Sequence, residues 1–167
     1  MKIKKICGLY EIQEEDFKNP IVSILDPNPQ YLGLGAENLR LIDKLNSNIH
    51  RMYFHDICSN YYYQYMQSLL EHRITILSPQ MLDDVLEFAR DKEDMIIHCH
   101  AGISRSTAIG YGILLQDGME PIDAAKYIHN IRPQAIPNTH ILGLISDKLG
   151  ISYSKMYQSY LKVFHNV

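Results

Sequence analysis

Cys99 and Arg105 are the residues whose types and spacing are best suited to chemistry. They lie in the segment His98-Cys99-His100-Ala101-Gly102-Ile103-Ser104-Arg105-Ser106-Thr107, between the apolar run 95–97 and the apolar segment 108–115. This pattern predicts a buried strand, a short loop and then a helix. The amides of such a loop and the N-terminus of the helix point toward a bound anion. Together with the charge of Arg105 they should favour a thiolate at Cys99, a nucleophile suited to attack a phosphate ester.

Other residues of the loop also have expected roles. Gly102 lets the backbone turn its N–H groups inward without a Cβ clash. Arg105 presents a planar fork that can hold two phosphoryl oxygens. The Ser106 hydroxyl could donate to the sulfur and help it leave when a phosphocysteine is hydrolysed. His98 is expected to order the loop through hydrogen bonds while pointing away from the phosphate. The predicted phosphate-binding residues are His100, Ala101, Gly102, Ile103, Ser104 and Arg105.

A general acid must protonate the leaving oxygen of a phosphate ester, and Asp56 is the best candidate. It ends the alternating stretch 51–56, in which Met52 and Phe54 would face the core of a strand. The same carboxylate could return as a base and activate the water that hydrolyses the phosphocysteine. The structural alternative is an aspartate that caps a turn. His55 is a rival acid, and Asp83 and Asp84 are further rivals in a helical context that favours a solvated face.

The string His98-Cys99-x-x-Gly102-x-x-Arg105-Ser106 resembles the active-site signature of the cysteine-dependent protein tyrosine phosphatase superfamily. Five specified positions coincide by chance on the order of once in ten million start points. The resemblance is to the compact dual-specificity branch and within it to small bacterial members, which also carry a stretch similar to Arg132-Pro133-Gln134-Ala135-Ile136-Pro137-Asn138. It extends from about Ile21 to Leu149.

The resemblance implies a fold, an activity and several roles. It implies an α/β fold with a small central sheet flanked by helices, and hydrolysis of phosphotyrosine, with phosphoserine and phosphothreonine as further substrates. It places an aspartate at the end of the strand before the signature and pairs it with isoleucine, as in Asp56-Ile57. It gives Asn138 a supporting role for the loop, beside a plain helix cap. The chain departs from the branch by its long interval between Asp56 and Cys99.

Other interpretations of these residues fit the sequence less well. Adjacent histidines around Cys99 project in different directions, and Cys-x-x-Cys is absent, which argues against a metal site. A buried structural cysteine would leave the glycine, arginine and serine spacing unexplained, and the Gly-Lys-Ser/Thr signature of nucleotide loops is absent. Functional alternatives are a phosphoinositide or RNA 5′-phosphatase of the same superfamily, a non-catalytic phosphate-binding module, and a rhodanese-like domain. The loop has no lysine, which argues mildly against polyanionic head groups.

Length and composition set further limits. With 167 residues, 46% hydrophobic and 21% charged, the chain suits one domain over 1–167. A net charge of −3 gives no general attraction to nucleic acid or acidic membranes. Three cysteines without framework spacing favour a reducing cytoplasm. We expect a monomer without a cofactor, metal, secretory signal or membrane span, whose partner is a phosphoprotein or phosphopeptide.

The elements that must position the loop follow from periodicity and turn residues. Strands are expected over 3–12, 21–25, 51–54 and 95–98, and helices over 36–46, 79–92, 106–116, 121–131, 138–149 and from about 154. Cys7 and Cys58 invite a redox hypothesis with Cys99, although burial as small apolar residues is the simpler interpretation. The tyrosines Tyr61, Tyr62, Tyr63 and Tyr65 belong to an expected insert over 58–77 and are expected to pack it.

Overall fold

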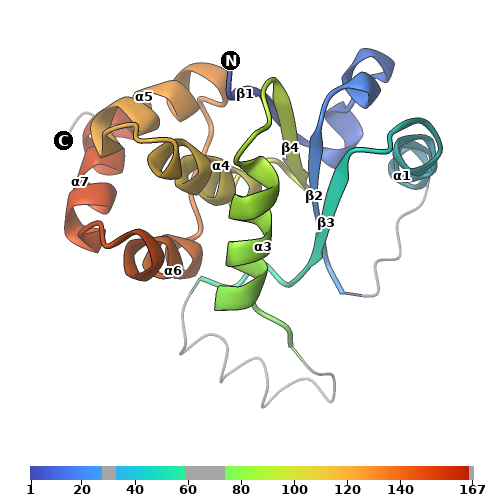
Figure 1. Ribbon diagram of the computed structural model, residues 1–167. Helices are drawn as coiled ribbons and strands as arrows, with labels where there is room; N and C mark the ends of the chain where they lie inside the picture. The colour runs from blue at the N-terminus through green and yellow to red at the C-terminus, as the bar shows by residue number, and fades with distance from the viewer. Residues whose placement is uncertain (28–32, 59–73, 166–167) are drawn as a thin grey trace.

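Four short parallel strands form the centre of the molecule in the computed structural model, which describes residues 1–27, 33–58 and 74–165 (Figure 1). The strands are β1 (Ile3–Gly8), β2 (Ile21–Leu25), β3 (Ile49–Tyr53) and β4 (Met95–Cys99), and their order in the sheet is β1-β4-β2-β3. All neighbouring pairs are parallel. The α/β class predicted from the sequence is confirmed.

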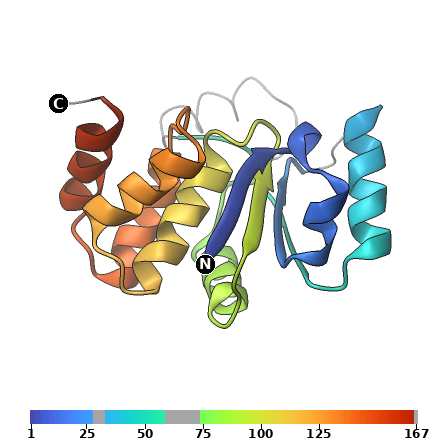
Figure 2. The same ribbon diagram turned by 90° about the horizontal axis from the view of Figure 1, so that it is seen from above.

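Helices cover both faces of this sheet (Figure 2). One face carries α1 (Leu34–Leu45) with the short 3-10 helices η1 (Leu9–Glu11) and η2 (Glu14–Lys18). The other face carries α3, α4, α5, α6 and α7, which span Pro79–Ala89, Arg105–Gln116, Pro121–Ile131, Thr139–Leu149 and Tyr153–Phe164. No helix within the described ranges is long and apolar enough to cross a membrane.

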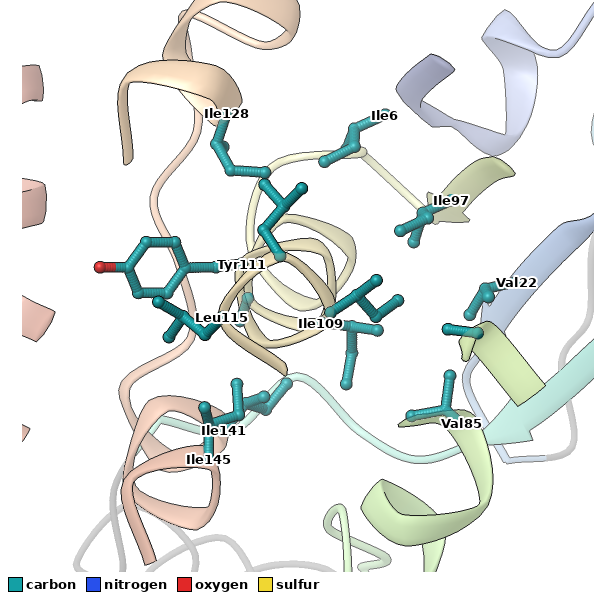
Figure 3. Close-up of a cluster of buried hydrophobic side chains, with 14 of the residues drawn as sticks. Ile6, Val22, Val85, Ile97, Ile109, Tyr111, Leu115, Ile128, Ile141 and Ile145 are labelled. Atoms are coloured by element: carbon teal, nitrogen blue, oxygen red, sulfur yellow. The ribbon is translucent and has the colours of Figure 1, made fainter. Parts of the chain in front are cut away.

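Helix α4 is the centre of the larger core (Figure 3). Its residues 105–115 are all buried, because apolar side chains surround the helix on every side. Side chains of alternating strand residues reach it from the sheet, among them Ile6, Val22 and Ile97. The strand residues between them, including Cys7 and Ile96, pack on the α1 face instead. The helix that begins at Arg105 is therefore held rigidly against the strand that ends at Cys99.

The first strand is shorter than the sequence pattern predicts. We expected a strand over 3–12, but β1 ends at Gly8, which is paired with Cys99 at the end of β4. Beyond that point β4 offers no further ladder, and the Leu9 amide donates to the His100 carbonyl at 3.1 Å. The Glu11 carboxylate accepts from the Gly8 amide at 2.6 Å and closes the turn of η1.

The carboxyl ends of all four strands lie at one edge of the sheet, because every pairing is parallel. The strand β4, buried along its whole length, lies between β1 and β2 and ends at Cys99. Segments that follow β1, β2 and β3 in sequence therefore surround the loop that follows β4. Such edges are where open α/β sheets usually bind ligands.

Shortening the Ile109 side chain should test the role of α4 in the core. Ile109 is fully buried, so Ile109→Ala should lower the free energy of unfolding by about 2–5 kcal/mol through lost burial and a residual cavity. Urea denaturation would measure it. Leu45→Ala, at a side chain that is 51% exposed, is the control and should change the free energy of unfolding by less than about 1 kcal/mol. Equal losses in the two variants would contradict the assignment of the core.

Candidate active site

The Cys99 sulfur lies at the bottom of the loop between β4 and α4. Its side chain is buried, and the Gly102 amide donates to Sγ at 3.2 Å. The Ser106 Oγ lies 3.3 Å from the same sulfur, the contact expected for a hydroxyl that assists the leaving thiolate. Helix α4 begins at Arg105 with its positive end toward this loop. The sulfur therefore faces an amide donor, a hydroxyl that can donate to a thiolate, and a helix N-terminus, all of which favour negative charge.

The loop carbonyls are all turned away from the sulfur side toward partners outside. The His100 carbonyl accepts from the Leu9 amide, and those of Ala101 and Gly102 accept from the Arg132 guanidinium. The carbonyls of residues 103 and 104 accept from the Thr107 hydroxyl and from backbone amides of the 136–138 segment. In a trans peptide the C=O and N–H point in opposite directions, so these bonds turn the amides of residues 101–105 inward. The loop has the form of an anion cradle.

Gly102 is the point where this loop contacts the sheet. Its φ is +72°, a conformation that residues with a side chain rarely adopt. An added Cβ would lie 2.2 Å from the Cys7 carbonyl carbon and 2.4 Å from the Gly8 nitrogen. Both atoms belong to the backbone of β1, so neither can move away without disturbing the sheet. The position therefore requires glycine for two independent reasons.

The Arg105 guanidinium is hydrogen-bonded at Nη1 but, within the described part of the chain, has no hydrogen-bond partner at Nε. Its side chain is 4% exposed, and Nη1 donates to Asp26 Oδ1 at 2.8 Å and to the Phe54 carbonyl at 2.7 Å. The Nε–H is buried and has no hydrogen-bond partner among the described residues. Asp56 Oδ2 lies 3.8 Å from Nε. A buried cationic donor without a hydrogen-bond partner is suited to an anionic ligand.

Asp56 is held over the loop by two donors. Its Oδ1 accepts from the Ser104 hydroxyl at 2.7 Å and from Asn138 Nδ2 at 2.8 Å. Asn138 also caps α6 by accepting from the Ile141 amide at 3.2 Å. Because the Asp56 side chain is 36% exposed, a substrate can reach it. The structure thus brings the predicted acid to the predicted loop.

The rival acids are engaged elsewhere. The His55 ring hydrogen-bonds with the Thr75 backbone at 3.1 Å. On α3, Asp83 pairs with Lys148 at 2.7 Å and Asp84 accepts from Gln80 at 2.8 Å. Both aspartates therefore serve contacts on or near the surface of α3, as their helical context indicated. Asp56 is the candidate that contacts a residue of the loop.

His98 lies beside the nucleophile at the end of β4, and its side chain is completely buried. Burial lowers the pKa of His98 to about 3, against a smaller opposing effect of a hydrogen bond with the Cys99 backbone, so the ring is neutral. His98 pairs in register with Cys7 and Ser23, and its side chain therefore lies on the face of the sheet opposite Cys99. Its role in ordering the loop stays a prediction.

The structure also argues against Cys7 as a redox partner of Cys99, because the two side chains lie on opposite faces of the sheet. Cys7 packs in the α1 cluster, whereas Cys99 packs in the larger core on the other face. Burial also raises the pKa of the Cys7 thiol to about 12, which makes it a poor nucleophile. Cys58 is exposed, and all three cysteines are free. The tyrosines 61–63 and 65, on which a substrate groove could depend, lie outside the described residues.

Sequence reasoning missed three side chains of this site. Asp26, to which the sequence analysis assigns no role, accepts a hydrogen bond from Arg105. Glu11 falls in the expected strand 3–12 and Arg132 in the resembling stretch 132–138, but the two form an ion pair at 2.8 Å beside the loop. The signal available for Asp26 was its position directly after a buried strand, which is the same signal that indicated Asp56. The signal for Arg132 was its place at the start of the stretch 132–138 that carries the family resemblance, whereas Glu11 carried no local signal.

Comparison with known proteins places this arrangement among phosphatase folds. No protein-family model and no curated protein sequence matches the chain. Solved structures do match: Tk-PTP in its active form (TM-score 0.57, 16% identity, covering 90% of this chain and 91% of that one) and the PTP-2 phosphatase of Cydia pomonella (TM-score 0.57, 16% identity, 86% and 83%). A third is PTPMT1 in complex with PI(5)P (TM-score 0.52, 14% identity, 84% and 80%). The chain has the fold of the cysteine-dependent tyrosine phosphatases. Its placement with the small bacterial members stays a prediction.

Adding a methyl group at Gly102 should destroy the anion cradle. Gly102→Ala must move the loop away from β1, because the new Cβ would overlap backbone atoms at 2.2 Å and 2.4 Å. We expect tungstate binding, measured by calorimetry, to weaken by more than about 100-fold, the scale of losing an oxyanion-binding donor. Gly143→Ala on α6 is the matched control, since nothing lies within 4 Å of its Cβ position. Tungstate binding of wild-type strength in Gly102→Ala would contradict the assigned role of the loop.

Proposed function

We propose that this protein is an enzyme that hydrolyses phosphotyrosine, with phosphoserine and phosphothreonine as further substrates. The observation that carries the proposal is the buried Arg105 Nε–H, which has no hydrogen-bond partner among the described residues, beside a loop whose carbonyls all face outward. A phosphoryl group held there would lie above the Cys99 sulfur, which accepts from the Gly102 amide and contacts the Ser106 hydroxyl. Phosphoryl transfer mainly needs such positioning and stabilisation of the equatorial oxygens.

The proposed reaction has two chemical steps. The Cys99 thiolate attacks phosphorus in line, an S–P bond forms, and the ester P–O bond breaks while Asp56 gives its proton to the leaving oxygen. In the second step Asp56 takes a proton from water, whose oxygen attacks phosphorus and breaks the S–P bond. Inorganic phosphate leaves, and the Ser106 hydroxyl, 3.3 Å from Sγ, donates to the departing thiolate. The Asp56 carboxylate therefore acts first as acid and then as base.

A phosphoinositide head group is the second candidate substrate. One solved structure of similar fold holds PI(5)P, which favours this alternative. Against it, the loop contains no lysine, and the carboxylates of Asp26 and Asp56 are both near Arg105 and partly exposed. A head group with several phosphates would meet two negative charges at this position, whereas a phosphotyrosine presents a single phosphate. We therefore favour the phosphoprotein substrate.

Hydrolysis of p-nitrophenyl phosphate in the presence of EDTA tests the thiolate mechanism. We expect the wild-type protein to be active and Cys99→Ser to lose more than about 1,000-fold in kcat, because a serine hydroxyl lacks the nucleophilicity of the thiolate. Cys58→Ser, at an exposed cysteine, is the matched control and should keep wild-type activity. Turnover that survives in Cys99→Ser would exclude a phosphocysteine intermediate.

Varying the leaving group tests Asp56 as the general acid. Asp56→Asn should lower kcat by about 100-fold or more with phenyl phosphate and much less with p-nitrophenyl phosphate, because nitrophenolate leaves more readily without a proton. Asp83→Asn serves as the control, since Asp83 pairs with Lys148 on the surface. If Asp56→Asn slows both substrates equally, another group supplies the proton.

A substrate panel separates the two candidate functions. Phosphotyrosine, phosphoserine and phosphothreonine peptides would be compared with soluble inositol lipids and triphosphorylated RNA at equal concentration. We expect the highest kcat/KM with a phosphotyrosine peptide. A higher kcat/KM with the inositol lipid would establish the phosphoinositide alternative instead, and no release of phosphate from any member would leave only phosphate binding.

A further inference from the structure

Arg132 contacts the nucleophile loop through backbone carbonyls alone. Its Nε donates to the Gly102 carbonyl at 2.9 Å and its Nη2 donates to the Ala101 carbonyl at 2.8 Å. The residue is only 9% exposed, so these bonds are largely shielded from water. One side chain thus satisfies two consecutive carbonyls of the loop, and these are the two whose outward direction turns the amides of Gly102 and Ile103 inward.

One of these peptide units connects Arg132 directly to the nucleophile. The oxygen of the Ala101–Gly102 peptide accepts a hydrogen bond from Arg132 Nη2, and the N–H of the same peptide donates to Cys99 Sγ at 3.2 Å. A cation at the oxygen polarises the peptide and strengthens its N–H as a donor, because successive hydrogen bonds reinforce one another in a shielded site. Arg132 therefore acts on the sulfur through a single peptide bond.

Glu11 holds Arg132 in this position. Its Oε2 lies 2.8 Å from Arg132 Nη1 and accepts from the Gly8 amide at 2.6 Å. Partial burial raises the pKa of Glu11, but the Gly8 hydrogen bond and Arg132 more than offset this effect, so the pKa is lowered. Gly8 in turn pairs in register with Cys99 at the ends of their strands. The ion pair thus connects the loop to the end of the neighbouring strand.

We propose that Arg132, oriented by Glu11, is a positioning residue that sets the reactivity of Cys99 and the shape of the phosphate cradle through the peptide units 101–102 and 102–103. The inference rests on the proposed function for its catalytic consequence but not for its structural one. Without the guanidinium, two shielded carbonyls lose their partners, and the peptide units are free to rotate their oxygens inward. Inward oxygens would repel both the thiolate and a phosphate.

The test compares Arg132→Met and Glu11→Gln with a matched ion pair of the same residue types. Arg90 and Glu87 on α3 lie 2.8 Å apart and are both exposed, so Arg90→Met and Glu87→Gln remove the same groups far from any expected role in the loop. Iodoacetamide, a neutral reagent, reports the reactivity of the sulfur when alkylation of the Cys99 peptide is followed by mass spectrometry at pH 7. Tungstate binding reports the cradle, and p-nitrophenyl phosphate hydrolysis reports catalysis.

We expect Arg132→Met to slow alkylation of Cys99 roughly 3- to 10-fold, the range of one hydrogen bond. Tungstate binding and kcat should both fall by about tenfold or more. Glu11→Gln should lower the alkylation rate, tungstate binding and kcat by smaller factors, because it keeps an acceptor for Gly8 and loses only the charge. Both α3 variants should behave as the wild type. A role confined to stability would lower the melting temperature without changing the alkylation rate of the folded protein.

The outcomes separate this inference from the proposed function. A folded Arg132→Met variant with wild-type alkylation and tungstate binding overturns the inference even if the enzyme is active. If Arg132→Met does not fold, Arg132→Lys, which keeps the charge but lacks the planar fork that binds the two carbonyls, and Glu11→Gln decide by the same readouts. If the wild type hydrolyses nothing but Cys99 alkylation still depends on Arg132, the positioning role stands and the proposed function falls. A wild type that neither hydrolyses the ester nor binds tungstate overturns both.

Discussion

The site depends on one constraint, which is that each carbonyl of residues 100–104 has a donor outside the loop. A loop that follows a buried strand would ordinarily direct some carbonyls toward its own centre, where they would repel an anion. Here the first amide of η1, the Arg132 side chain, the Thr107 hydroxyl and amides of the segment before α6 donate to all of them. The inward amides are a consequence of this external bonding, and the concave anion site exists only while the surrounding elements remain docked.

The charges around the loop explain why this constraint matters. Arg105 carries one positive charge and already bonds to Asp26 at 2.8 Å, with Asp56 at 3.8 Å. A phosphate dianion that enters beside a thiolate therefore cannot depend on the guanidinium alone. Inward amides and the N-terminus of α4 must supply the remaining stabilisation, and they do so with dipoles that are fixed before the ligand arrives. Preorganised dipoles need no reorganisation when charge develops.

The sequence predicted the parts of this arrangement that are local and missed those that are not. The strand, loop and helix around Cys99, the place of Asp56 just after a strand and the helix that Asn138 caps all leave a signal in spacing or periodicity. Contacts of Arg105 with Asp26, or of Arg132 with Glu11, join residues about 80 and 120 positions apart in the chain. Such pairs depend on which strands become neighbours. The position of Glu11 also required β1 to end at Gly8, which follows from the length of its partner strand rather than from its own pattern.

His98 and Arg132 show that position in the sequence does not decide which side chains reach the nucleophile. His98 is next to Cys99, but alternation along the strand directs its side chain to the opposite face of the sheet, in line with its expected direction away from the phosphate. Arg132, 33 positions after Cys99, acts on the sulfur through a peptide instead. It reaches the loop because α5 ends beside it. Proximity to a nucleophile is therefore decided by the sheet and its crossovers. In a parallel sheet, the residues to examine are those that follow each strand and those at the ends of the helices packed against the same edge.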